Sequence, residues 1–163
     1  MPDATPYRVR RIPVAPEPQV TDACSYADSF ELRVAHPDSD TAERWVRAAL
    51  GQAGPGVRSV IRFAHGRVAR FALSTEPNSI LGWRTVSSTP EALHIRTEGP
   101  LLRAEIVARR TTPTTMTLTT VLFYRRRRTR FIWLLMGPAH RRIAPSLLAR
   151  AAKRLTLPAD ATT

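Results

Sequence analysis

The segment Thr129–Leu155 constrains the fold most, because it has the pattern of a long helix whose apolar side needs a surface to cover it. Its apolar residues recur every three or four positions, which aligns them in one stripe on a helix of 3.6 residues per turn. The stripe consists of Ile132, Met136, Ala139, Ile143, Leu147, Ala151 and Leu155. Pro138 and Pro145 fall inside the segment. They predict either one bent helix or a helix that starts near Pro138, after a last strand at 131–136.

The residues before this helix predict the surface that covers it. Four stretches have the alternation typical of strands, and turn signals such as Gly99-Pro100 separate them. The stretches are 80–88, 93–98, 101–110 and 114–125. Such short connections predict an antiparallel meander with one apolar face turned toward the helix. Residues 68–73 predict a further strand or, as the alternative, the tail of the helix that precedes them.

Upstream of the meander, the chain predicts one strand and two helices. Residues 26–35 alternate between apolar and polar side chains, which is typical of a half-buried strand. Asp40 stands three residues before Glu43, the spacing of a capping box, and predicts a helix that ends at Gly51. A second short helix is expected at 57–64. Its inward face would consist of Val57, Val60, Ile61 and Ala64.

The length of 163 residues suits a single domain, and an apolar content of 43% is enough to form a core. Residues 1–21 contain five prolines, so we expect an extended Pro- and Arg-rich arm there. Residues 22–157 would form one domain, and residues 158–163 a disordered tail. The predicted class is α+β.

The composition also bounds the compartment and the partners. The net charge is +12, which favours attraction to nucleic acid, to anionic lipid or to an acidic ligand. Cys24 is the only cysteine, so no internal disulfide forms. The first twenty residues lack the apolar core of a signal peptide, and the run 131–136 is far too short to span a bilayer. We therefore expect a soluble, cytoplasmic protein.

Motifs for common chemistries are absent from the sequence. The histidines at 36, 65, 94 and 140 lack the short spacings of a metal site, so we predict no metal and no cofactor. The chain has no nucleophile elbow, no Walker loop and no pair of carboxylates beside a histidine. Hydrolase and phosphotransferase functions therefore have no support.

Three local motifs carry a resemblance to a known superfamily. They are the run Tyr26-Ala27-Asp28-Ser29-Phe30, the run Gly82-Trp83-Arg84, and the set Phe131, Trp133, Pro138 and His140. Together with the order of the elements, they resemble an uncharacterised bacterial branch of the START-like superfamily, which includes polyketide cyclases (SRPBCC, helix-grip fold). The resemblance covers about residues 9–155. It implies a curved antiparallel sheet wrapped around the long C-terminal helix, with a cavity between them.

The inward faces of the predicted elements supply candidate residues for such a cavity. They are Trp83, Arg84, Leu102, Ile106, Met116, Leu118, Thr120, Tyr124, Trp133, Met136 and His140. Arg84 follows Trp83 directly, so only one of the two can point inward from a strand. His140 lies on the apolar stripe and is a candidate acid–base group, although a hydrogen-bonded core histidine has the same position. The aromatic residues are expected in the core or the cavity wall.

Charged residues on the opposite faces predict a solvated outer surface. His94, Arg96 and Glu98 oppose the apolar residues of their strand, as Arg103 and Glu105 do in the next. The run Arg125 to Arg128, with Arg130, Arg141, Arg142, Arg150 and Arg154 after it, predicts a solvated basic surface or one that binds nucleic acid or an anionic membrane. The apolar run 131–136 beside these arginines has two interpretations, insertion into a membrane interface or packing in the core, and packing in the core is favoured because the run is short.

These observations support three functions. The favoured one is binding of a hydrophobic or amphipathic small molecule in the cavity, without turnover. The second is a cyclase or dehydratase that acts on a polyketide-like substrate and uses His140. The sequence reveals no acid or base to partner this histidine, so catalysis has less support. The third is binding of nucleic acid or an anionic membrane through the arginines. No oligomeric state is indicated.

Overall fold

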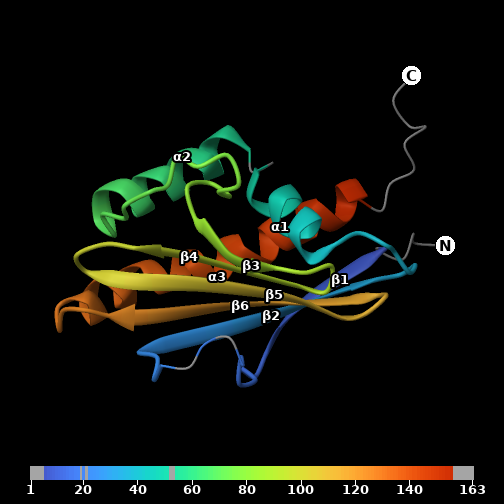
Figure 1. Cartoon of the computed structure of the whole chain (residues 1–163), viewed down its shortest axis with the longest axis horizontal. Coiled ribbons are helices and arrows are strands. Elements are labelled where there is room, and N and C mark those ends of the chain that lie inside the picture. The colour runs from blue at the N-terminus through green and yellow to red at the C-terminus, as the bar shows by residue number, and fades with distance from the viewer. Residues whose placement is uncertain (1–5, 19, 21, 52–53, 156–163) are drawn as a thin grey trace.

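The computed structural model describes residues 6–18, 20, 22–51 and 54–155, and it confirms the α+β class. The core is a six-stranded antiparallel sheet with the strand order β1-β2-β6-β5-β4-β3. The strands are β1 (Tyr7–Ile12), β2 (Tyr26–Val34), β3 (Arg84–Ser88), β4 (Ala92–Glu98), β5 (Leu102–Thr112) and β6 (Thr115–Tyr124). The helices are α1 (Ala42–Gly51), α2 (Pro55–Phe63) and α3 (Thr129–Leu155). In Figure 1, α1 and α2 lie above the sheet, and α3 runs along it.

Local sequence patterns explain the central strands. In β2, Phe30, Leu32 and Val34 are buried, whereas Arg33 between them is exposed. This alternation puts the apolar side chains on the face that packs against α1 and α3. β5 pairs with β6 along nearly its whole length, as expected of a meander with the short turn at Pro113. The strand β1 comes from the segment predicted as an arm: residues 7–12 are extended and add an edge strand beside β2.

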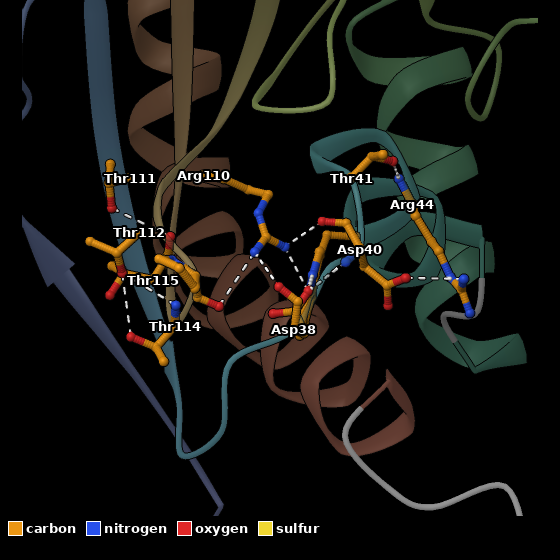
Figure 2. Close-up of polar contacts among 11 residues, drawn as sticks. Asp38, Asp40, Thr41, Arg44, Arg110, Thr111, Thr112, Thr114 and Thr115 are labelled. Atoms are coloured by element: carbon orange, nitrogen blue, oxygen red, sulfur yellow. Dashed lines mark hydrogen bonds and ion pairs between the residues drawn. The ribbon is translucent and has the colours of Figure 1, made fainter.

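The start of α1 differs from the prediction by one residue. The backbone N–H of Arg44 donates to Oγ1 of Thr41 at 3.2 Å, so Thr41 supplies the cap and the box predicted from Asp40 is wrong. Asp40 instead forms an ion pair with Arg44 at 3.0 Å (Figure 2). Glu43 accepts hydrogen bonds from Arg47 and Ser88, which ties α1 to β3.

The segment between α2 and β3 has little regular structure. α2 continues into a π-helical turn, η1 (Ala64–Val68), and the strand predicted at 68–73 does not form. Arg70 has a φ of 54°, in the left-handed region, which interrupts any extended run there. Leu81 and Gly82 also have positive φ values, in a tight turn that pairs Ile80 with Trp83, so β3 begins only at Arg84.

The helix α3 is continuous from Thr129 to Leu155 and contains both Pro138 and Pro145. The alternative of a last strand at 131–136 is therefore wrong. The hydroxyl of Thr129 donates to the carbonyl of Leu101 at 2.8 Å, which joins the first turn of the helix to the sheet. The C-terminal half is the better buried, through Ala144, Leu147, Leu148, Ala151 and Ala152.

The apolar run at the start of α3 is only partly in the core. Ile132, Trp133 and Met136 are partly buried, but Phe131, Leu134 and Leu135 are exposed. The prediction that the whole run 131–136 packs in the core is therefore wrong, because a helix presents its consecutive residues on all sides. Within the described part of the chain, no helix combines the length and apolarity needed to cross a membrane. The tail predicted at 158–163 lies outside the described residues.

Candidate ligand cavity

A cavity of about 170 Å³ lies between the sheet and the helices. Its floor consists of inward residues of β5 and β6, and one wall is the inward side of α3 from Thr129 to Leu148. α1, α2, η1 and the loop before β3 close the remaining sides. Most lining side chains are apolar, because the inner face of the sheet and the stripe of α3 both face this space. The polar side chains among the lining residues are those of His65, Thr120, Thr129 and His140, together with the indole nitrogen of Trp133.

The structure brings eight of the eleven candidate residues together around the cavity. These are Trp83, Leu102, Ile106, Leu118, Thr120, Trp133, Met136 and His140. Arg84, the first residue of β3, is exposed and does not line the cavity, whereas Trp83 in the turn before it does. Met116 lies at the other end of β6, beside a small second pocket that Trp45 and Arg110 also line. Tyr124 is partly buried against the core and does not line the cavity.

Sequence reasoning missed the lining residues that α1, η1 and the irregular loop contribute. They include Val46, Leu50, His65 and Phe71. The sequence did predict an inward face for the second helix, and three residues of that face, Val60, Ile61 and Ala64, line the cavity. Phe71 had no such signal, because its position depends on a loop with positive φ angles.

Three rings form the aromatic end of the cavity. The ring centroid of His65 lies 5.4 Å from that of Phe71 and 5.6 Å from that of Trp83. Phe71 and Trp83 are themselves 5.9 Å apart, edge to face. Burial lowers the pKa of His65 from 6.5 to about 4, and the nearby charge of His140 adds to this effect. His65 is therefore neutral at neutral pH, and this end of the cavity carries no charge.

A second, polar part of the cavity wall is organised by Asp28, which is fully buried. Its Oδ2 accepts a hydrogen bond of 2.8 Å from the Tyr26 hydroxyl, and its Oδ1 lies 3.2 Å from Nε2 of His140. The sequence alone reveals no partner for His140; the structure places this carboxylate against it. A signal existed, because Asp28 is on the same face of its strand as Phe30. A lone acidic residue on an apolar face points to a buried interaction.

Burial raises the pKa of the Tyr26 hydroxyl, and the charge of Asp28 raises it further, whereas the nearby Arg141 opposes the rise. The Tyr26 hydroxyl therefore stays protonated at neutral pH and donates to Asp28. Trp133 packs against the two residues that contact Asp28. Its ring centroid lies 5.0 Å from that of Tyr26 and 5.2 Å from that of His140.

Two buried polar atoms in the cavity wall have no hydrogen-bond partner among the described residues. They are Nε1 of Trp133 and Oγ1 of Thr120. Thr120 pairs with Asp28 across β6 and β2, so its hydroxyl belongs to the polar part of the cavity wall. Buried polar groups are normally hydrogen-bonded, and an unpaired donor in a cavity wall is a position where a ligand or water accepts. The cavity can thus hold an apolar body and hydrogen-bond a polar group at this part of its wall.

A separate charged cluster lies on the outer face of the sheet. Nε2 of His94 contacts Glu105 at 2.8 Å, and Arg96 and Arg103 each approach the same carboxylate at 3.0 Å. Burial raises the pKa of Glu105, but the hydrogen bond from His94 and the charge of Arg96 outweigh it and lower the pKa overall. The side chains of His94 and Glu105 are 2% and 1% exposed, so the predicted solvated face is wrong for these two residues.

The segment between β1 and β2 explains this burial, because it crosses the outer face. Glu17 accepts hydrogen bonds from Arg109 at 3.0 Å and from Thr119 at 3.1 Å. Asp22 accepts from Arg103 at 2.6 Å.

Glu98, at the end of β4, remains exposed and pairs with Arg125. In the part of the chain that the structure describes, no three His, Cys, Asp or Glu side chains gather as a metal site would require.

No protein-family model, curated protein or solved structure matches this chain. The inference of function therefore rests on the cavity and its chemistry.

Proposed function

We propose that the protein binds a small, largely apolar molecule in the cavity between its sheet and α3, within a helix-grip fold of the START-like type. The observation that carries the proposal is the cavity itself, which has a volume of about 170 Å³ and a mostly apolar lining. Ligand sites in proteins are typically apolar pockets with a few placed polar groups. An engineered apolar cavity of about 150 Å³ binds benzene, so the space fits a ligand built on one ring.

The two unpaired polar atoms define the rest of the ligand. The Trp133 indole N–H can only donate, so it requires an acceptor. The Thr120 hydroxyl can donate or accept. A carbonyl or hydroxyl group on the ligand supplies the acceptor that the Trp133 indole requires, whereas a pure hydrocarbon would leave both atoms unpaired at a cost in affinity.

Calorimetric titration with p-cresol, a single ring with one hydroxyl, tests the proposal. We expect binding that Ala104→Leu weakens at least about tenfold, because the larger side chain fills the floor of the cavity. Ala35→Leu is the matched control, since Ala35 is exposed and away from the lining. Native mass spectrometry of the purified protein would identify a ligand that is already bound. Equal affinity of both variants and the parent protein would refute the cavity as the binding site.

A second candidate function is acid–base catalysis in the same cavity, and the contact between Asp28 and His140 favours it. A buried carboxylate that orients a histidine is a recurrent arrangement for a general base. A cyclase or dehydratase acting on a polyketide-like substrate would use His140 to move a proton beside the substrate carbonyl. His140→Gln should then abolish turnover of a β-ketone substrate, followed by mass spectrometry, but leave binding of p-cresol within about threefold of the parent. Equal turnover by the variant would exclude this function.

A further inference from the structure

The outward face of the first half of α3 is apolar and exposed. Phe131, Leu134 and Leu135 are 58%, 75% and 82% exposed. Their spacing of three and four residues puts them on one side of the helix, opposite the side that lines the cavity. Large apolar side chains that cluster on a surface are typical of an interaction site, whereas single exposed leucines are ordinary.

Arginines surround these apolar residues. Arg126, Arg127 and Arg128 are exposed in the turn that leads into α3, and Arg130 follows at its start. The guanidinium carbon of Arg130 lies 4.6 Å from the centre of the Phe131 ring. Arg142 is exposed about two turns beyond Leu135, on the same side of the helix. We call these eight residues the arginine–leucine surface: Arg126, Arg127, Arg128, Arg130, Phe131, Leu134, Leu135 and Arg142.

The positive charge of this surface is not neutralised by the protein. No aspartate or glutamate occurs in the sequence between Glu105 and Asp160. Nine arginines elsewhere in the described chain, Arg47 and Arg110 among them, have a carboxylate partner. Among the described residues, none of the five arginines of the arginine–leucine surface forms an ion pair. Five arginines without a carboxylate partner therefore surround the most exposed leucines of the described chain.

We propose that the arginine–leucine surface docks on an anionic lipid bilayer, with the arginines at the phosphate groups and with Phe131, Leu134 and Leu135 inserted among the upper acyl chains. A helix face of Leu and Phe flanked by arginines matches the interfacial binding of amphipathic helices. Each arginine near an anionic membrane adds to the attraction, and inserted apolar side chains add the hydrophobic contribution. The docking surface does not depend on what the cavity binds.

Two other occupants fit less well. A second copy of the chain would bring arginines against arginines across a two-fold axis, and like charges in contact oppose association. Nucleic acid would satisfy the arginines, but exposed leucines gain nothing from a phosphate backbone. A bilayer is the occupant that uses both halves of the surface.

Co-sedimentation with vesicles of phosphatidylcholine, with or without phosphatidylglycerol, tests the proposal. We expect binding only to the vesicles that contain phosphatidylglycerol, with affinity falling between about 0.1 M and about 0.5 M salt. The double variant Leu134→Asp with Leu135→Asp should bind at least about tenfold more weakly, because it loses insertion and adds negative charge. Val86→Asp, at an exposed position of β3, is the control for an added acidic group.

A matched pair of charge reversals separates the local surface from the net charge. Arg127→Glu with Arg128→Glu should weaken vesicle binding at least about tenfold. Arg8→Glu with Arg11→Glu makes the same change of net charge at two exposed positions of β1 and should weaken it by less than about threefold. Equal loss in both pairs would show that net charge alone governs binding and would overturn the proposal.

Analytical ultracentrifugation and duplex DNA complete the test. The proposal fails if the parent protein is a dimer that does not bind vesicles and the Leu134 and Leu135 double variant is a monomer. The face is then an interface between two copies of the chain. Binding of the parent to duplex DNA, unaffected by the leucine variant and without vesicle binding, would likewise overturn it.

Discussion

Acidification should destabilise the protein through His65, because the folded state holds this side chain in its neutral form. Burial between Phe71 and Trp83 lowers the pKa of His65 in the folded protein to about 4, against an ordinary value of 6.5. Between these values the unfolded chain binds a proton that the folded chain excludes. The free energy of unfolding therefore falls as the pH decreases from about 6.5 to about 4, and His65 adds no further loss below that.

The pKa difference sets the size of this effect. One pKa unit corresponds to about 1.4 kcal/mol, so the complete effect of His65 is about 3 kcal/mol at pH 4 and below. Between pH 7.5 and pH 5, about 2 kcal/mol of it would be expressed. His65 keeps some contact with solvent, which reduces the expected loss over this range to between about 1 and about 2 kcal/mol.

Urea unfolding of the parent protein and of His65→Leu at both pH values measures this contribution. The leucine cannot titrate, so the variant should lose about 1 to 2 kcal/mol less than the parent on acidification. Val46→Ala, another change in the cavity lining, is the control for a general loss of packing and should keep the pH dependence of the parent. If His65→Leu loses as much stability as the parent between the two pH values, His65 is not buried in its neutral form.

Three further substitutions test the buried polar groups. Asp28→Ala removes the acceptor of Tyr26 and the partner of His140, and it should lower the free energy of unfolding by about 2 to 4 kcal/mol in urea; an unchanged stability would contradict the buried contacts. Arg110 pairs with Asp38 and donates to the backbone carbonyls of Asp38, Asp40 and Pro113 (Figure 2). Arg110→Met should therefore lower the free energy of unfolding by about 2 to 3 kcal/mol, and Arg110→Lys should restore less than half of that loss. Full recovery by lysine would show that charge alone matters there. Glu105→Gln should lower the free energy of unfolding by about 3 kcal/mol at pH 7 and by less at low pH. A carboxylate whose pKa is lowered stabilises the fold above its ordinary pKa of 4.5, and this stabilisation is lost as the pH falls. A cost that is the same at pH 3 as at pH 7 would contradict this assignment.

The regular elements around the cavity were predictable from local periodicity. Alternation located β2, β4, β5 and β6, and spacing of three and four residues located α1, α2 and α3 to within a few residues. The inward faces of these elements follow from the same patterns, so residues such as Leu102 and Trp133 could be assigned to a cavity from their positions in the sequence. Periodicity works because burial on one face selects apolar residues at the repeat of the backbone.

The charged contacts were not predictable in this way. Asp28 and His140 are 112 residues apart in the sequence, and His94 meets Glu105 only because β4 and β5 pair in one particular register. The outer face of the sheet looks solvated in the sequence, since its strands carry charged side chains there. It is partly buried because a segment that includes Glu17 crosses it, and no property of the strands themselves reveals that cover.

Local patterns were thus enough to predict the order and type of most elements and the side of each that turns inward. They did not predict which polar groups meet, where the chain between α2 and β3 runs, or which apolar residues of α3 remain exposed. Local patterns record whether a position is apolar, whereas pairing depends on contacts between distant segments. A leucine on the far side of a helix, such as Leu135, has the same local signal whether another surface covers it or not.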